Sequence, residues 1–177
     1  FQHAEELPPG GAEEIMKTGL LNDLDFIYGQ HVSPEFEVGQ IDIKEGPVTA
    51  SSDVYKITLY GLGGHASDPY RAVNPLNIVS KLIQAFTEIP SQQIDAQKSA
   101  VVSNTYINAG NSVSLNIIPD TLEFGGNIRT FDKEVAESIE AKMKQILDGI
   151  CGYYGATYEF NFEHGARSVS NDKAKTR

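Results

Sequence analysis

The sequence predicts an α/β protein in two parts. A fragment of an α/β sheet is expected over residues 1–46, where a helix pattern stands between short strand patterns. A larger β-α-β-β-α-β unit is expected over residues 47–165, where alternating strand patterns are separated by two apolar stripes at helical spacing. The change from one pattern to the other places the boundary near Gly46.

The first part should contain the end of a strand, a short helix and further strands. The opening FQHAEELPPGG is an apolar start followed by turn residues, and Ile15, Met16 and Leu20 then recur at helical spacing, with Gly19 as C-cap. Residues 25–32, ending near His31, are rich in β-branched and aromatic residues and predict a strand. A second short strand is expected over 39–46.

The second part begins with a strand and a helix. Residues 50–61 alternate apolar and polar side chains and end in the glycine-rich loop GLGGHASDP. Residues 73–90 predict a helix that starts with Asn74 as N-cap and Pro75 in the first turn. Its predicted apolar stripe is Leu76, Ile78, Val79, Leu82, Ile83 and Phe86.

Two strand regions, a helix and a last strand complete this part. Residues 99–110 and 112–131 predict strands joined by a turn, and residues 132–155 predict a helix with Asp132 as N-cap. Residues 156–165 alternate as a final strand. This order is that of the split βαβ, ferredoxin-like arrangement, one antiparallel sheet with two helices on one face.

Composition limits the partners of the protein. The net charge is −10, from 24 acidic and 14 basic residues, which argues against a nucleic acid because phosphates require clustered Lys and Arg. The sequence contains no apolar run of the ~20 residues that span a bilayer and no signal peptide pattern, so we expect a soluble protein without a membrane partner. The single cysteine, Cys151, excludes an intrachain disulfide and favours the cytoplasm. The start at Phe1 suggests part of a longer protein.

Glu5 and Glu6 are the first candidates for chemistry. Adjacent carboxylates at a loop can divide the work of hydrolysis, one binding a metal and the other taking a proton from water, although such pairs are also common on solvated surfaces. His31 could join Glu6 at one metal, because imidazole at a strand end is a frequent zinc ligand. The alternative for His31 is packing and hydrogen bonding at a sheet edge.

Three residues of the second part are further candidates. His65 lies in the glycine-rich loop, where a histidine can stabilise a developing oxyanion or be merely exposed to solvent. Asn116 and Arg129 lie in consecutive strand regions, and an arginine beside a Gly pair can bind a substrate carboxylate. A surface position is the alternative for Arg129.

Together, five segments resemble one family. In order they are FQHAEELPPGGA, DFIYGQHVSP, GLGGHASDPYRAVNP, NIIPDTLEFGGNIRTF and the tail SVSND, and they cover nearly the whole chain. They resemble the metal-dependent amidohydrolases that include hippurate hydrolase, N-acyl-amino-acid amidohydrolases and plant auxin-conjugate hydrolases, relatives of the aminoacylases and zinc carboxypeptidases.

The resemblance implies roles around a metal. By motif match, Glu5 is the general base, and Glu6 and His31 are metal ligands. The family usually has Pro where this chain has His3, so His3 is not assigned as a ligand. The family's upstream Cys/His/Asp ligand motif and its downstream histidine have no counterpart here, and Cys151 falls in the wrong place to replace them.

The resemblance also implies roles around the substrate. His65 would contact the scissile carbonyl from a lid domain, in related enzymes often across a dimer, and Asn116 and Arg129 would hold the end of the substrate. The parts would be a fragment of the metal-binding catalytic domain (1–46), a lid and dimerisation domain (47–165) and a segment returning to the catalytic domain (166–177).

The implied function is hydrolysis of the amide bond of an N-acyl amino acid or small peptide. Two divalent metals, zinc or manganese, would activate the water, and the protein would form a homodimer through the lid. The fragment alone would be inactive because part of its ligand set is missing. The alternative is a non-catalytic ferredoxin-like module for dimerisation or ligand binding.

Overall fold

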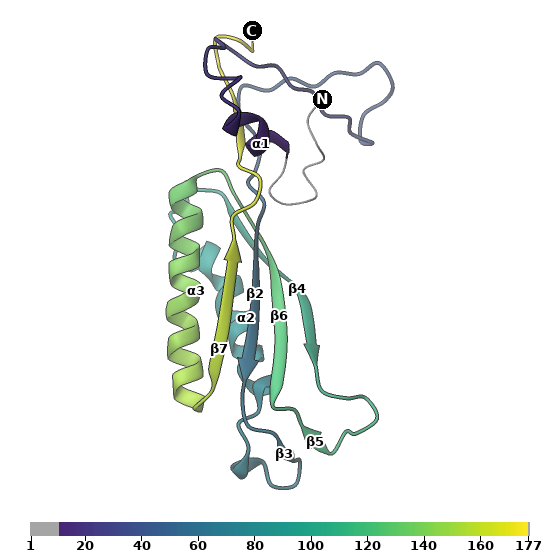
Figure 1. The fold of residues 1–177 in the computed structure, drawn as a ribbon, viewed down its shortest axis with the longest axis vertical. Helices are drawn as coiled ribbons and strands as arrows, with labels where there is room; N and C mark the ends of the chain where they lie inside the picture. Colours follow the sequence, from purple (N-terminus) through teal and green to yellow (C-terminus); the bar gives the residue numbers. More distant parts are fainter. Residues whose placement is uncertain (1–10, 177) are drawn as a thin grey trace. The chain divides into compact units, whose positions relative to one another are not determined.

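The computed structural model describes residues 11–176, the side chain of Glu13 excepted, so the predictions for His3, Glu5 and Glu6 lie outside the described residues. Figure 1 shows the arrangement of the helices and strands. In chain order they are α1 (Gly11–Lys17), β1 (Gly46–Thr49), β2 (Asp53–Tyr60), β3 (Gly64–His65), the 3-10 turn η1 (Pro69–Arg71), α2 (Pro75–Gln92), β4 (Ala100–Ala109), β5 (Ile117–Ile118), β6 (Thr121–Thr130), α3 (Lys133–Tyr154), β7 (Thr157–Glu163) and β8 (Val169–Asn171).

The chain divides into two compact units. The larger unit is Ala50–Ser168, and the smaller unit combines the segments before Ala50 and after Ser168. The roles predicted for 1–46, 47–165 and 166–177 concern a longer enzyme and stay predictions.

The larger unit is a four-stranded antiparallel sheet in the order β4-β6-β2-β7. Helices α2 and α3 lie on one face of this sheet (Figure 1). Read along the chain, β2-α2-β4-β6-α3-β7 is the β-α-β-β-α-β order, and the strands at the two edges are β4 and β7. The predicted ferredoxin-like arrangement is confirmed.

Helix α2 begins as its sequence predicts. The Asn74 side chain accepts a hydrogen bond from the Leu76 N–H at 3.0 Å, and Pro75 occupies the first turn. One position of the predicted apolar stripe is wrong, because Leu76 in the first turn of the helix is 43% exposed. The buried face of α2 consists of Pro75, Ile78, Val79, Leu82, Phe86 and Ile89.

Asp132 is the N-cap residue of helix α3, as predicted, but its side chain does not cap the helix. The Asp132 carboxylate instead pairs with Lys98 Nζ at 3.0 Å. The helix ends at Gly155, whose φ of 71° is the left-handed conformation typical of a C-cap glycine. None of the described helices is long and apolar enough to cross a membrane.

Three aromatic rings form the centre of the core between sheet and helices. Phe86 of α2 stacks on Phe124 of β6 at 6.0 Å, and Tyr55 of β2 meets both rings edge-on. Burial raises the pKa of the Tyr55 hydroxyl, which donates to Asn104 Oδ1 at 2.7 Å. The buried phenol therefore stays protonated and bonded.

Gly126 makes room for this packing. A Cβ at Gly126 would lie 1.9 Å from the Ser103 carbonyl oxygen and 2.7 Å from the Tyr55 hydroxyl. Only glycine therefore fits where β6 passes between β4 and the tyrosine ring.

The smaller unit contains less regular structure than predicted. Helix α1 is confirmed, and Gly19 after it has a φ of 74°. The strands predicted over 25–32 and 39–46 are wrong, since the described residues from Thr18 to Glu45 contain no strand and β1 begins at Gly46, paired with β8. A strand exists only when a neighbour completes its hydrogen bonds, and the β1–β8 pair is the only sheet among the described residues of this unit.

The contrast between two glycines gives a stability test. We expect Gly126→Ala to lower the free energy of unfolding by about 3 kcal/mol, because the new methyl group must displace backbone. Gly149→Ala is the control, since nothing lies within 4 Å of its added Cβ, at an exposed position inside α3. Alanine there should raise stability by roughly 0.5–1 kcal/mol. Urea denaturation of both variants measures the difference, and equal stabilities would contradict the packing described for Gly126.

Candidate active site

A two-stranded ribbon at one end of the larger unit brings two of the predicted residues together. Strand β3 pairs with β5, with His65 opposite Ile117, so that Asn116 lies beside the histidine. Asn116 Nδ2 is 3.4 Å from His65 Nε2, and the Ala66 N–H donates to the Asn116 carbonyl oxygen at 2.9 Å. Two residues that are 51 positions apart in the sequence thus form one polar pair.

His65 of this pair borders an open hollow of about 350 Å³. The hollow is lined by Gly63, Gly64, His65, Ile117, Ile118 and Asp120. Large apolar side chains are exposed on β5 and on the segments next to β3 and β5 in the chain, namely Leu62, Tyr70, Val113, Leu115 and Ile117. An imidazole and an amide within an apolar surface can orient the polar group of a small molecule while its apolar part is covered.

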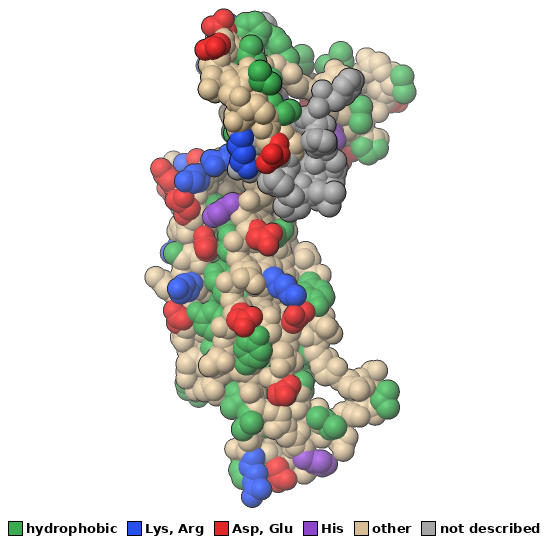
Figure 2. Space-filling model, in the orientation of Figure 1, with side chains coloured by type: hydrophobic (Ala, Val, Ile, Leu, Met, Phe, Trp, Pro, Cys, Tyr) green, Lys and Arg blue, Asp and Glu red, His purple; other side chains and the backbone are tan. Residues whose placement is uncertain are grey.

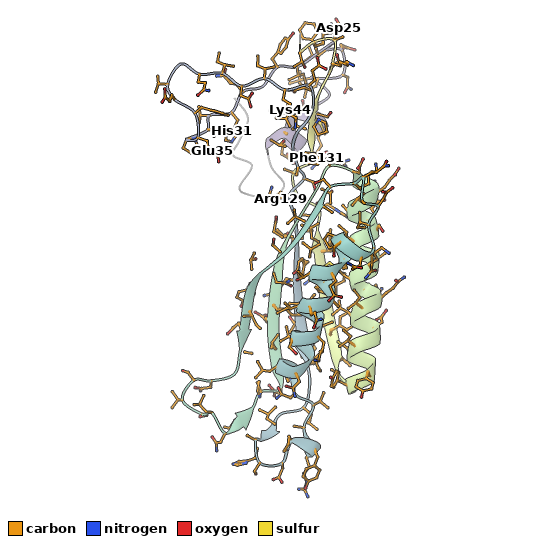
Figure 3. The ribbon with its side chains drawn as sticks, turned by 180° about the vertical axis from the view of Figure 1, so that it is seen from behind. Asp25, His31, Glu35, Lys44, Arg129 and Phe131 are labelled. Carbon is orange, nitrogen blue, oxygen red and sulfur yellow. The ribbon has the colours of Figure 1, made fainter. Side chains whose placement is uncertain are left out.

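Arg129 lies far from this pair. It is near the end of β6, and the ten-residue strand spans roughly 30 Å, so the arginine and the β3–β5 ribbon lie at opposite ends of the sheet (Figure 3). Arg129 Nε donates to Asn127 Oδ1 at 2.7 Å, and its Nη1 to the Ser51 carbonyl oxygen at 3.5 Å. A substrate of amino-acid size cannot touch both Arg129 and His65 of one chain.

A buried carboxylate supports the end of the sheet where Arg129 lies. Asp53 is 3% exposed, accepts from Ser51 Oγ at 3.0 Å and the Gly165 N–H at 3.3 Å, and lies 3.5 Å from His164 Nδ1. His164 Nε2 lies 3.6 Å from a carboxylate oxygen of Glu140 on α3. The sequence signals this group only by an acidic residue, Asp53, at the start of a buried strand pattern.

His31 lies in the smaller unit, on an irregular segment that also carries Glu35 (Figure 3). Its Nδ1 is 2.6 Å from the Val32 carbonyl oxygen. Because a carbonyl only accepts, Nδ1 carries the proton and Nε2 presents the lone pair, which is the tautomer that binds a metal through Nε2.

The described residues do not by themselves complete a metal site. Over residues 11–176, apart from the side chain of Glu13, no group of three His, Cys, Asp or Glu side chains could hold an ion. Of the predicted ligands, His31 fits a metal by its tautomer, and Glu6 lies outside the described residues.

Cys151 is not suited to metal binding or nucleophilic attack. It is 2% exposed on the buried face of α3, and burial together with the charge of Asp148 raises the pKa of its thiol to about 11. At neutral pH the residue is therefore a thiol, whereas metals and nucleophilic attack require the thiolate.

The family comparison decides the identity of the larger unit. Residues 51–154 match the peptidase dimerisation domain family. The chain belongs to this family. The match covers α2, α3 and every strand of the four-stranded sheet except β7.

The similarity of this peptidase dimerisation domain protein to its relatives extends beyond the matched region. The chain is 38% identical over 172 residues to N-acetylcysteine deacetylase of Bacillus subtilis, covering 97% of this chain and 44% of the relative. It is 40% identical over 152 residues to hippurate hydrolase of Campylobacter jejuni, covering 85% of this chain and 39% of the relative. The chain therefore spans less than half the length of these curated relatives.

A solved structure agrees with the sequence relatives. The Bacillus subtilis YXEP protein, described as a dinuclear metal binding peptidase of the M20 family, is similar with a TM-score of 0.73 and 34% identity. The similarity covers 99% of this chain and 43% of that protein. The predicted resemblance to amidohydrolases is confirmed.

The state of Cys151 can be tested directly because it is the only thiol. We expect an aromatic disulfide reagent to modify it at neutral pH only as the protein unfolds in denaturant. In a Cys151→Ala background, Tyr153→Cys places a thiol at a position that is 84% exposed, and this control should react at once in the native state. Rapid native-state labelling of Cys151 would contradict its burial.

Proposed function

We propose that this chain is part of a metal-dependent amidohydrolase that cleaves the amide bond of N-acyl amino acids or small peptides. The observation that carries the proposal is the His65–Asn116 pair, which lies on an exposed end of a peptidase dimerisation domain, beside a hollow with an apolar border. The deacetylase and hippurate hydrolase relatives support an N-acyl amino acid as substrate.

The surface of residues 11–45 supports a larger catalytic domain around this segment. Large apolar side chains are exposed along it, namely Met16, Leu20, Leu24, Phe26, Ile27, Tyr28, Val32, Phe36, Val38, Ile41 and Ile43. A surface this rich in apolar groups is typical of one that packs against further protein. We assign the segment to the metal-binding catalytic domain and residues 166–177 to the return into it.

His31 and Glu6 would hold the metal together with ligands from the rest of that domain. Two divalent ions, zinc or manganese, would polarise the substrate carbonyl and lower the pKa of water toward ~7 when bound. The description of the YXEP protein as dinuclear supports two ions.

The residues of this chain would then divide the reaction. Glu5 would take the proton of the attacking water and deliver it to the leaving amine. His65 would donate a hydrogen bond to the carbonyl oxygen as negative charge grows there, a contribution typically worth about 10²–10³ in rate. Asn116 and Arg129 would hold the substrate's end, the arginine through N–H donors beyond the two that bond Asn127 and Ser51.

The length of the sheet supports a homodimer as the working form. His65 and Arg129 of one chain lie at opposite ends of a sheet roughly 30 Å long. One substrate can therefore contact a His65 and an Arg129 only if two chains contribute to its site. We propose that the β3–β5 end of one chain serves the site to which the other chain supplies Arg129.

Strand β4 is the edge best suited to join the two copies. Its sequence AVVSNTYINA contains no charged residue, whereas edges that avoid pairing usually carry charge. The opposite edge, β7, carries Glu159 and Glu163. The open face of the sheet is also charged (Figure 2), and there the Lys56–Glu123 ion pair lowers the pKa of the Glu123 carboxyl.

The metal assignment gives a test on the 177-residue chain. With Glu6 and His31 as its only assigned ligands, the chain should retain less than one zinc ion after dialysis and should not hydrolyse hippurate, because a catalytic site needs about three protein ligands. Metal analysis and a hydrolysis assay measure both. Stoichiometric zinc with robust hydrolysis would contradict the ligand assignment, whereas a longer parent protein that also lacks hydrolysis would favour the non-catalytic module.

The edge assignment gives a test of assembly. Val101 and Ile107 are 50% and 52% exposed on β4. The double substitution Val101→Lys and Ile107→Lys should convert a dimer into a monomer in sedimentation velocity, because two copies paired through β4 would bring like charges together.

Val54→Lys is the matched control for this test. Val54 is 42% exposed but lies on the central strand β2, so its substitution should leave the dimer intact. An unchanged dimer in the β4 double variant would place the interface elsewhere.

A further inference from the structure

One hydrogen-bond partner of the His65 ring is a backbone N–H, which cannot change from donor to acceptor. His65 Nδ1 is 2.7 Å from Ser67 Oγ and 3.2 Å from the backbone nitrogen of Ser67. A hydroxyl can donate or accept, but a backbone N–H only donates. The Ser67 N–H meets the geometric requirements of a donor to Nδ1, so Nδ1 must present its lone pair.

We infer that Ser67 is a positioning residue that holds His65 as the Nε2–H tautomer. If Nδ1 carried the proton, that proton and the Ser67 N–H would point at each other across 3.2 Å. With Nδ1 unprotonated, the backbone N–H and the hydroxyl both donate to it, and the ring's only N–H lies on Nε2. Only the use of this N–H in catalysis rests on the proposed function; the tautomer itself does not.

The Asn116 amide can adapt to this tautomer. Its nitrogen is 3.4 Å from His65 Nε2, but the nitrogen and oxygen of an amide exchange places by a half-turn. A histidine with Nε2–H requires the oxygen of Asn116 at this point. The backbone N–H of Ser67 therefore determines the tautomer of the His65 ring, and that tautomer determines the orientation of the Asn116 amide.

As a consequence, the His65 Nε2–H donor is already oriented before a substrate binds. Nε2–H is held on the side of the ring away from Ser67, and His65 is one of the residues that line the hollow, with Gly64 and Ile117. A carbonyl oxygen entering the hollow would replace the oxygen of Asn116 as acceptor, with no change of tautomer. Preorganised donors of this kind act without the delay and cost of rearrangement.

Nitrogen-15 NMR of the imidazole rings tests the inference on the 177-residue chain. The chain has four histidines, which makes assignment feasible, and His31 is an internal reference because its Nδ1 donates to a carbonyl. We expect opposite tautomers, Nε2–H for His65 and Nδ1–H for His31. A predominantly Nδ1–H form of His65 would overturn the inference.

Variants at Ser67 separate the contribution of the side chain. Ser67→Ala removes one donor to Nδ1 and should raise the ratio of the Nδ1–H to the Nε2–H form about fivefold, the equivalent of one ordinary hydrogen bond. Ser67→Thr keeps the hydroxyl and should restore the original ratio, and Ser114→Ala in the neighbouring loop should leave it unchanged. An unchanged ratio in Ser67→Ala would overturn the role of the hydroxyl. The measurement needs no hydrolysis, so its result is independent of whether the proposed amidohydrolase activity is found.

Discussion

The stacking of Phe86 on Phe124, with Tyr55 against the edges of both, is the packing on which the larger unit depends. It joins α2 to the two central strands and fixes the spacing between helix layer and sheet. Beside this cluster, β4 and β6 pair closely at Gly126, where a Cβ would meet the Ser103 carbonyl oxygen and the Tyr55 hydroxyl. His65 and Arg129 owe their separation to this rigid sheet.

Two histidines in the chain present opposite nitrogens to their surroundings. At His31 the carbonyl of Val32 accepts a hydrogen bond from Nδ1–H, so the lone pair is on Nε2, which suits a metal ligand. At His65 the Ser67 N–H faces Nδ1 and leaves a proton on Nε2, which suits a hydrogen-bond donor. In each case a backbone group one or two residues away makes the choice, so the chemistry of the side chain follows from the local course of the chain.

The sequence predicted the larger unit well because its signals are local. The alternation in β2, the Asn74 cap of α2 and the stripe on α3 each lie within one segment, and the order of the elements then leaves few topologies. The strands predicted over 25–32 and 39–46 failed because a strand depends on a neighbour, which cannot be found in the strand's own residues. Likewise the motifs indicated His65, Asn116 and Arg129 as site residues. Only the fold shows that the pairing of β3 with β5 brings His65 and Asn116 together, away from Arg129.

The uncharged sequence of β4 has a consequence for how far assembly can proceed. A strand edge that attracts another copy could in principle extend into an open-ended ribbon, as in fibrils. When the same edge of two copies pairs around a two-fold axis, however, it is used up on both, and the outermost strands of the combined sheet are then the two β7 strands. Glu159 and Glu163 on each would repel a third copy. If two copies pair through β4 as proposed, the unequal charge of the two edges would limit the assembly to two chains.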